Sequence, residues 1–423
     1  MKLDFNVRQL ELARRIVGAG AICDECLGRA FARVGRGWTN AERGRVIRSR
    51  IPEPSRAGVC WVCGGLFAAA EAWADRAIRH VEGVEFDSYL FGVRLSPRVE
   101  EMETLRNERF PSDDGESLKH AFNRVVGKAF EARLDRSVTV SFAAPDVSFV
   151  ADLAADVLRV HVASLYVYGR YRKLARGIPQ TRWPCRRCRG RGCTACGFTG
   201  KQYPESVEEW IAAPLLEAAD AEGAHLHGAG REDIDARMLG GGRPFVLELI
   251  APRRRTLDVA ALGTAVNDHA AGKVEVSELT RVNRGTVAWL KEMRAAKRYR
   301  ATVSFDAPVD AERLDEAVSG IWGEIEQQTP HRVSHRRADR VRRRRVISAS
   351  AVLESPCRAV VELEGEGGLY VKELISGDEG RTRPSLSERL GVGAVVTELD
   401  VLEVCSEALA DGVRPMDNDE TLP

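Results

Sequence analysis

The feature that most constrains the fold is a set of four Cys-x-x-Cys pairs, which contain eight of the ten cysteines in the chain. One pair presents two thiolates to a tetrahedral ion, and two pairs complete a Cys₄ zinc site. Disulfides are less expected, because the N-terminus lacks the basic and then apolar pattern of a secretion signal. We therefore predict two structural zinc sites, formed by Cys23, Cys26, Cys60 and Cys63, and by Cys185, Cys188, Cys193 and Cys196.

These cysteines have alternative interpretations. A redox dithiol is one, but such a pair usually stands alone at the start of a helix. For the second set, the alternative is a single ion shared with the first set. Residues 1–68 are too few to build a core alone, so a bound metal would stabilise this region. The two remaining cysteines, Cys357 and Cys405, stand singly in apolar runs and are predicted to be core thiols.

A length of 423 residues exceeds what one ordinary core covers, so we expect two or three domains. Mixed helical and alternating spacing indicates an α/β or α+β module, and we expect the α+β class. Helical spacing occurs near residues 6–19, 66–81, 118–134 and 206–221. Alternating runs predict strands near residues 86–95, 138–142, 147–153 and 157–168. We expect domain limits at residues 1–68, 69–205 and 206–423.

Composition excludes some classes of protein. No run reaches the ~18 apolar residues of a membrane helix, so we expect a cytoplasmic protein. A net charge of +1 does not by itself indicate a nucleic-acid partner. The distribution of charge is more informative, because the basic residues cluster while the acidic residues are spread.

Two basic stretches are candidates for contact with RNA. In residues 164–180, tyrosines alternate with cations, and aromatic rings that stack on bases beside cations that bind phosphate are typical of single-stranded RNA recognition. The alternative is an edge strand with a solvated basic turn. Residues 327–345 are the most basic stretch of the chain, and their alternative is a solvated face. The candidate contacts are Tyr168, Arg170, Arg172, Lys173, Arg336 and Arg337.

A candidate catalytic acid precedes the apolar run 245–250. Gly230-Arg231-Glu232-Asp233-Ile234-Asp235 places carboxylates close to an arginine, just before an expected buried strand. A guanidinium can hold a carboxylate ionised and fixed in direction, as a carboxylate nucleophile requires. An ordinary surface ion pair is the alternative from spacing alone.

The segment that begins at Gly230, with Gly242-Arg243-Pro244-Phe245 after it, resembles the active-site signature of archaeal and eukaryotic tRNA pseudouridine synthases of the "Pus ten" class. The stretch 164–180 is similar to the end of that family's THUMP domain, a tRNA-binding module. Residues 297–299 resemble the family's Lys-x-Tyr element, and 327–337 resemble its Arg-Thr-Pro-x-Arg-Val-x-His-Arg-Arg element. The block 367–373 resembles Ala-Gly-Thr-Tyr-Ile-Lys-Glu. The chain departs from these patterns at Gln328 and Leu369.

The resemblance implies a zinc-binding N-terminal region, a THUMP-like RNA-binding domain that carries the second cysteine set, and a mixed-sheet pseudouridine synthase domain. It implies that Asp233 is the nucleophile, with Asp235 as the competing candidate. Tyr299 would stack on the target base, Tyr370 and Lys372 would line the uracil pocket, and Arg231 or another basic residue would steady the carboxylate.

The implied reaction is isomerisation of uridine to pseudouridine in the tRNA T-loop, at position 54, position 55 or both. The implied partner is the tRNA T-arm, and neither an organic cofactor nor an obligate protein partner is expected. One alternative is a THUMP-bearing tRNA-modifying enzyme of another class, although the sequence lacks a strand-Gly-x-Gly-x-x-Gly-helix unit. The other is a non-catalytic, zinc-dependent tRNA-binding protein.

Overall fold

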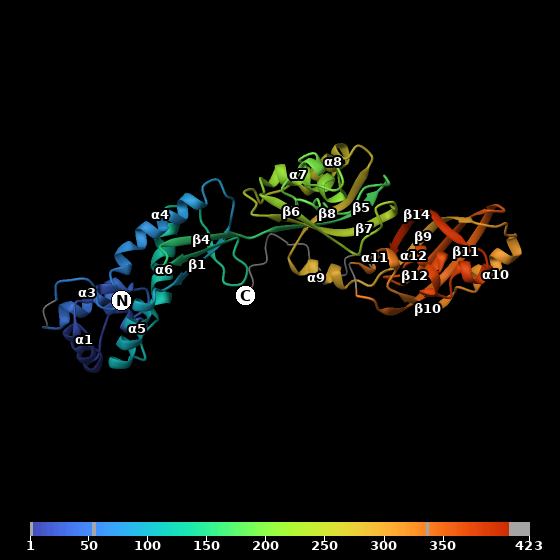
Figure 1. Ribbon diagram of the computed structural model, residues 1–423. Helices are drawn as coiled ribbons and strands as arrows, with labels where there is room; N and C mark the ends of the chain where they lie inside the picture. Colours follow the sequence, from blue (N-terminus) through green and yellow to red (C-terminus); the bar gives the residue numbers. More distant parts are fainter. Residues whose placement is uncertain (1–2, 53–55, 336–337, 406–423) are drawn as a thin grey trace. The chain divides into compact units, whose positions relative to one another are not determined.

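The computed structural model describes residues 3–52, 56–335 and 338–405, which fall into two compact units, Met1–Ala163 and Ser164–Pro423 (Figure 1). The division lies earlier in the chain than the expected boundary at residue 205. The reason is strand β5 (Leu165–Lys173), which pairs with β7 (Arg237–Ile250) and β8 (Val274–Val282) of the second unit. The second cysteine set therefore belongs to the second unit. The predicted α+β class is confirmed.

The first unit begins with short helices around the first cysteine set. Side chains cap the first and third helices: Asn6 and Gln9 form a capping box, as do Thr39 and Glu42. Cys23 is the N-cap residue of the second helix. The helices of this part are α1 (Val7–Ala19), α2 (Asp24–Gly28), η1 (Arg29–Phe31), α3 (Asn40–Arg50), η2 (Leu66–Ala69) and α4 (Ala70–His80).

A mixed sheet with the order β2-β1-β3-β4 completes the described part of the first unit. Phe130 packs against Phe86 and Phe149 and joins α6 to this sheet. The prediction of one strand over residues 157–168 was wrong in one respect. Two strands occupy this range, and the chain between them, residues 163–164, is where the two units divide. The elements are β1 (Ser88–Arg94), α5 (Pro97–Arg109), α6 (Leu118–Glu131), β2 (Thr139–Val140), β3 (Val147–Asp152) and β4 (Val157–Val162).

The described part of the second unit is built on a ten-stranded sheet with the order β13-β10-β11-β12-β9-β14-β7-β5-β8, in which β6 also pairs with β7. Nearly all neighbouring strands are antiparallel, and the pair β7–β14 is parallel. The strands not yet given are β6 (Gly223–Gly228), β9 (Ala296–Phe305), β10 (Gly323–Gln328), β11 (Val341–Ser355), β12 (Arg358–Gly365), β13 (Thr382–Arg383) and β14 (Ala394–Cys405).

Helices cover both faces of the half of the sheet that contains β5, β6, β7 and β8. Side chains alternate along a strand, so Val167 and Leu247 face the core that contains α7, while Tyr168 and Val246 pack in a smaller cluster with Leu290 of α9 (Figure 1). Ser206 caps α7. The helices here are η3 (Thr194–Cys196), α7 (Val207–Ala219), α8 (Val259–His269) and α9 (Gly285–Glu292).

In the other half of the sheet, the inward residues of β9 pack with the short helices that follow. Ala301 and Val303 are fully buried in the same core as Leu374 of α12 and Leu386 of α13. The helices are α10 (Ala311–Ser319), α11 (His331–Ser334), α12 (Val371–Ser376), η4 (Asp378–Gly380) and α13 (Leu386–Leu390).

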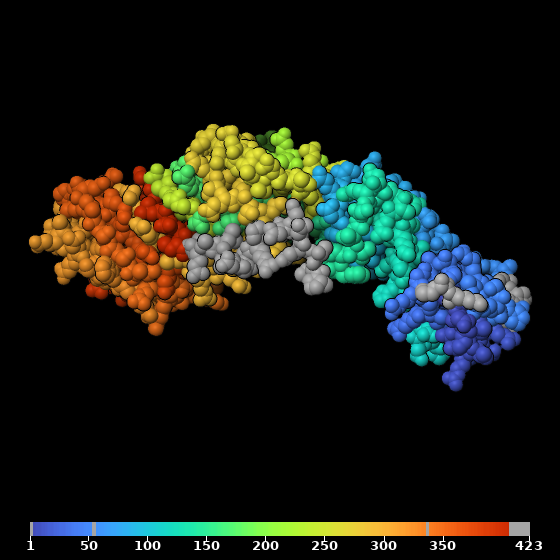
Figure 2. All heavy atoms as spheres, turned by 180° about the vertical axis from the view of Figure 1, so that it is seen from behind, coloured from blue at the N-terminus to red at the C-terminus, as the bar shows by residue number. Residues whose placement is uncertain are grey.

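The two halves of the sheet meet at a narrow seam, which we define as the pairs Asp400–Arg237 and Val401–Met238 between β14 and β7. Arg237 donates to both carboxylate oxygens of Asp400, at 2.9 and 2.6 Å, and Arg176 donates to Oδ1 at 2.7 Å. Figure 2 shows β14, in red, between the yellow-green atoms of the first half and the orange atoms of the second. The seam lies directly after the segment that carries Asp233.

The two single cysteines do not lie where the sequence predicted. Cys357, in the turn between β11 and β12, and Cys405, the last residue of β14, are exposed rather than buried, so their prediction as core thiols was wrong. In the described residues, no helix is both long enough and apolar enough to cross a membrane.

Candidate active site

The loop 229–236, between β6 and β7, carries Asp233, and a buried lysine fixes its backbone. Lys173, at the end of β5, is fully buried. Its Nζ donates to the carbonyl oxygens of Ile178, Asp233 and Ile234 at 2.8, 3.1 and 3.1 Å. These three acceptors match the three N–H donors of an ammonium group. Burial lowers the pKa of Lys173, and the charge of Glu232 opposes this shift.

A buried ion pair fixes the start of the same loop. Glu232 accepts hydrogen bonds from Nε of Arg243 at 2.9 Å and from the hydroxyl of Tyr171 at 2.9 Å, and all three side chains are almost completely buried. Arg243 also donates to the carbonyl of Ala229 at 2.8 Å. Gly230 has a φ of +77°, which favours glycine, and a Cβ there would lie 3.3 Å from Nη1 of Arg243. Sequence reasoning missed Glu232 and Arg243 as supports of the loop.

Asp233 is partly exposed, and two cations hold its carboxylate. Nη1 of Arg332, on α11, lies 3.0 Å from Oδ1, and Nζ of Lys372, on α12, lies 3.7 Å from Oδ2. Arg332 also contacts the buried carboxylate of Glu373, at 2.6 Å from Nε to Oε1. Burial opposes the charge of Arg332, but the hydrogen bond to Glu373 and the charge of Asp233 outweigh it and raise the pKa of the guanidinium.

The sequence left open whether Arg231 or another basic residue steadies Asp233, and in the structure Arg332 is the arginine that contacts the carboxylate. Arg231 is exposed and forms no ion pair with another described residue, whereas Arg332 occupies that position. The basic stretch 327–345 contained this residue, but its pairing with Asp233 spans 99 positions of sequence and follows from no local spacing rule.

Asp235, the competing candidate for the nucleophile, lies in a different environment from Asp233. Its side chain is 65% exposed, and both oxygens accept hydrogen bonds from Lys372, at 2.9 and 2.7 Å. Burial would raise the pKa of Asp235, but the hydrogen bonds and charge of Lys372 outweigh this effect and lower it. Lys372 thus contacts both acids, and only Asp233 lines the main cavity described next.

A cavity of about 680 Å³ opens beside Asp233, and Tyr299, Tyr370, Lys372 and Leu369 line it. Tyr299 extends from β9 and is buried. Burial raises its pKa to about 12, although the charge of Arg243 opposes the shift. Lys297, which sequence reasoning did not assign to the site, also lines the cavity; burial lowers its pKa to about 8, and the charge of Arg243 adds to this effect. Predicted site residues from three separate sequence stretches thus line one cavity.

The predicted RNA contacts on β5 are mostly engaged within the protein. Tyr168 is buried against α9, and Lys173 binds the Asp233 loop, so neither side chain is accessible to RNA and these two predictions were wrong. Arg170 donates to the carbonyls of Gly241 and Gly242, and Arg172 is ion-paired with Glu275. Arg336 and Arg337 lie outside the described residues.

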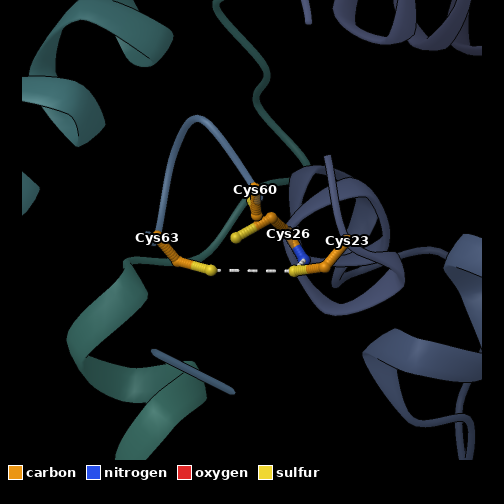
Figure 3. Close-up of side chains that lie close together, drawn as sticks. All are labelled: Cys23, Cys26, Cys60 and Cys63. Carbon is orange, nitrogen blue, oxygen red and sulfur yellow. Dashed lines mark hydrogen bonds between the residues drawn. The ribbon is translucent and has the colours of Figure 1, made fainter. Parts of the chain in front are cut away.

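Each cysteine set is gathered as a metal site requires. The four Sγ atoms of each set lie within 4.8 Å of one another. Figure 3 shows the first set, in which Sγ of Cys23 and Sγ of Cys63 are 3.8 Å apart. In the second set, Cys196 is 3.9 Å from Cys188 and 3.7 Å from Cys193, measured between Sγ atoms. Metal–sulfur distances of about 2.3 Å give a tetrahedral edge of about 3.8 Å, so both sets fit one ion each.

Comparison with known proteins agrees with this geometry. Residues 166–405 match the family model described as Pus10, C-terminal, and residues 73–152 match the one described as Pus10 THUMP domain, archaeal. The protein is therefore a pseudouridine synthase, an isomerase, that carries a THUMP domain.

Two curated relatives have nearly the same length. The chain is 50% identical over 414 residues to the tRNA pseudouridine synthase Pus10 of Halorubrum lacusprofundi, a match that covers 94% of this chain and 96% of that protein. It is 46% identical over 427 residues to the same-named protein of Methanothrix thermoacetophila, with 93% and 94% covered. The chain belongs to the Pus10 family. The expected resemblance is confirmed, and neither alternative function class is retained.

Among solved structures, the chain is similar to one titled "Crystal Structure of a Cbf5-Nop10-Gar1 Complex", at 18% identity and a TM-score of 0.30. That similarity covers 55% of this chain and 50% of the other.

Proposed function

We propose that the protein isomerises uridine to pseudouridine in the T-loop of tRNA, at position 54, position 55 or both, with Asp233 as the nucleophile. The observation that carries this proposal is the carboxylate of Asp233 at the edge of a 680 Å³ cavity, 3.0 Å from Arg332 and beside Tyr299 and Tyr370. The names of the curated relatives support tRNA as the substrate.

In the proposed reaction, Asp233 attacks the target nucleoside at C1′ of the ribose or C6 of the base, and the glycosidic bond breaks. The uracil turns within the cavity, C5 bonds to C1′, and the bond to Asp233 breaks, which restores the carboxylate. The C5–H bond then breaks with its electrons returning to the ring, and N1, which took the electron pair of the glycosidic bond, gains a proton. Arg332 holds the carboxylate in a fixed direction before the attack. Tyr299 and Tyr370 offer ring surfaces for a base that has left its stack. Positioning and electrostatics then supply the acceleration.

The direct test is conversion of uridine in an unmodified tRNA transcript, measured by mass spectrometry. We expect pseudouridine in the T-loop. Transcripts with cytidine at position 54 or at position 55 identify which uridine reacts. If the purified protein leaves all T-loop uridines unchanged in a tRNA that it binds, the T-loop assignment is wrong.

We further propose zinc as the ion of both cysteine sets, with a structural role, because four thiolates in tetrahedral arrangement suit this metal. Elemental analysis should find about two zinc ions per chain, since each set fits one ion. Cys26→Ser and Cys188→Ser should each lose one ion. Cys357→Ser, a change at an exposed cysteine outside both sets, is the control and should keep both. A zinc content near zero in the unmodified protein would contradict the proposal.

We predict that Lys173 positions the loop that carries Asp233 and does not itself contact the substrate. Lys173→Met removes two hydrogen bonds to the loop that carries Asp233 and one to the carbonyl of Ile178. Misplacement of a reacting group by 1 Å costs about 100-fold in rate. We expect kcat to fall by about this factor, with tRNA affinity nearly unchanged. Hydrogen exchange in residues 230–236 should become faster.

The matched control is Arg172→Met, which changes the adjacent cation on β5 but removes only an ion pair with Glu275 at the surface. It should leave kcat and hydrogen exchange of the loop as they are. Slower exchange or an unchanged kcat in Lys173→Met would show that the buried ammonium does not set the position of Asp233.

A further inference from the structure

A second cavity, of about 260 Å³, shares walls with the active-site cavity. Asp233, Arg231, Arg332 and Lys372 line both spaces, so a group in the second cavity lies directly beside a group in the first. Trp183 lines the second cavity and not the first. Neither the proposed attack by Asp233 nor the stacking of Tyr299 accounts for this space.

The hairpin that carries the second cysteine set holds Trp183. The carbonyl of Trp183 accepts from the backbone amide of Gln202 at 2.9 Å, and Pro184 forms a β-bridge with Lys201. The rings of Trp183 and Tyr203 approach edge to face, with centroids 5.7 Å apart and planes at 82°. The cysteines between these two arms therefore close a short rigid hairpin, and Trp183 stands at its base.

The chemistry of the second cavity suits a nucleotide. An aromatic surface beside cations is the combination that binds single-stranded RNA, because the ring stacks on a base and the cations contact phosphate. Arg332 and Lys372 are occupied by Asp233 and Asp235. Arg231 has no ion pair with another residue in the described ranges and lines both cavities, so its guanidinium can bind the phosphate between two successive nucleotides.

We propose that this second cavity is a subsite for the nucleobase adjacent to the target uridine, with Trp183 as its stacking surface and Arg231 as the contact for the intervening phosphate. The proposal rests on the proposed function, since it takes the main cavity to hold the target uridine. It also gives the second cysteine set a role in the site, because that set supports the hairpin on which Trp183 lies.

The experiment combines changes in the protein and in the RNA. Transcript tRNAs carry an abasic nucleotide either directly 5′ or directly 3′ of the reacting uridine, and pseudouridine formation gives kcat and KM. With the unmodified protein, one of the two abasic tRNAs should show a KM higher by about 5- to 150-fold, the effect of losing one base–aromatic stack. Trp183→Ala should raise KM for intact tRNA by a similar factor and leave kcat nearly unchanged.

The decisive measurement combines the Trp183→Ala protein with the abasic tRNA. In Trp183→Ala, the abasic nucleotide should cause no further rise in KM, because the stack is already absent. Trp183→Phe should restore most of the affinity. Trp322→Ala removes a half-exposed tryptophan that lines neither of these two cavities and is the control; it should change neither constant. Fully additive effects at both neighbours would overturn the subsite. Absence of pseudouridine with every tRNA would instead refute the proposed function.

Discussion

Replacing Asp233 with alanine is expected to abolish pseudouridine formation, with a loss of roughly 10⁴-fold or more, the scale seen when a covalent nucleophile is removed. Affinity for tRNA should remain within a few-fold of the unmodified protein. The proposal assigns this carboxylate to the reaction rather than to the bulk of the RNA contact. After its loss, Arg332 still pairs with Glu373 and Lys372 with Asp235. Single-turnover assays and filter binding measure the two quantities separately.

Asp235→Ala is the matched control, because this acid lies two positions away and shares Lys372 with Asp233. We expect it to keep most of the activity, since its side chain is largely exposed and does not line the main cavity. The reverse pattern, with Asp235→Ala inactive and Asp233→Ala active, would transfer the nucleophilic role to Asp235.

The second large effect is expected from Arg332→Met, which should lower kcat by about 10²- to 10³-fold, as loss of a positioned charge in an active site does. The arginine bridges Asp233 and the buried Glu373, so its removal leaves both carboxylates without their common partner. Arg332→Lys should recover little, because an ammonium cannot reproduce the N–H contacts that two edges of a planar guanidinium make with Glu373 and Asp233.

Arg343→Met is the control for lost positive charge within the same basic stretch. Arg343 is exposed and pairs with Glu324 and Glu326 on the neighbouring strand, away from the cavity. It should weaken tRNA binding slightly or not at all and leave kcat unchanged. Equal losses of kcat in Arg332→Met and Arg343→Met would mean that Arg332 acts only through general attraction of RNA.

Local patterns predicted most of the fold. The helices expected near 6–19, 118–134 and 206–221 are α1, α6 and α7, because each has an apolar face at helical spacing and a side-chain cap. Helix α5 was not predicted, since its charged sequence has little apolar periodicity and only Arg106 is buried. The ten-stranded order also could not be predicted, because it depends on pairs such as β5–β7 that join distant segments.

For the site, sequence reasoning selected residues that the fold brings together: Asp233, Tyr299, Tyr370 and Lys372 all line one cavity. Their chemical roles remain predictions. Lys173 was misassigned because a lysine after tyrosines and arginines looks solvent-exposed, and nothing local reveals the carbonyl acceptors at Asp233 and Ile234. Burial of a cation depends on partners supplied by another part of the chain.

The seam between β7 and β14 has a consequence for how this enzyme can be divided. Asp233 is supplied from one side of the seam, whereas Arg332, Tyr299 and Lys372 are supplied from the other. In the described residues, β7 and β14 pair at two positions, and Arg237 and Arg176 add contacts to the carboxylate of Asp400. Each half alone would thus lack part of the proposed site, and fragments of the enzyme should regain catalysis when they reassemble along this line.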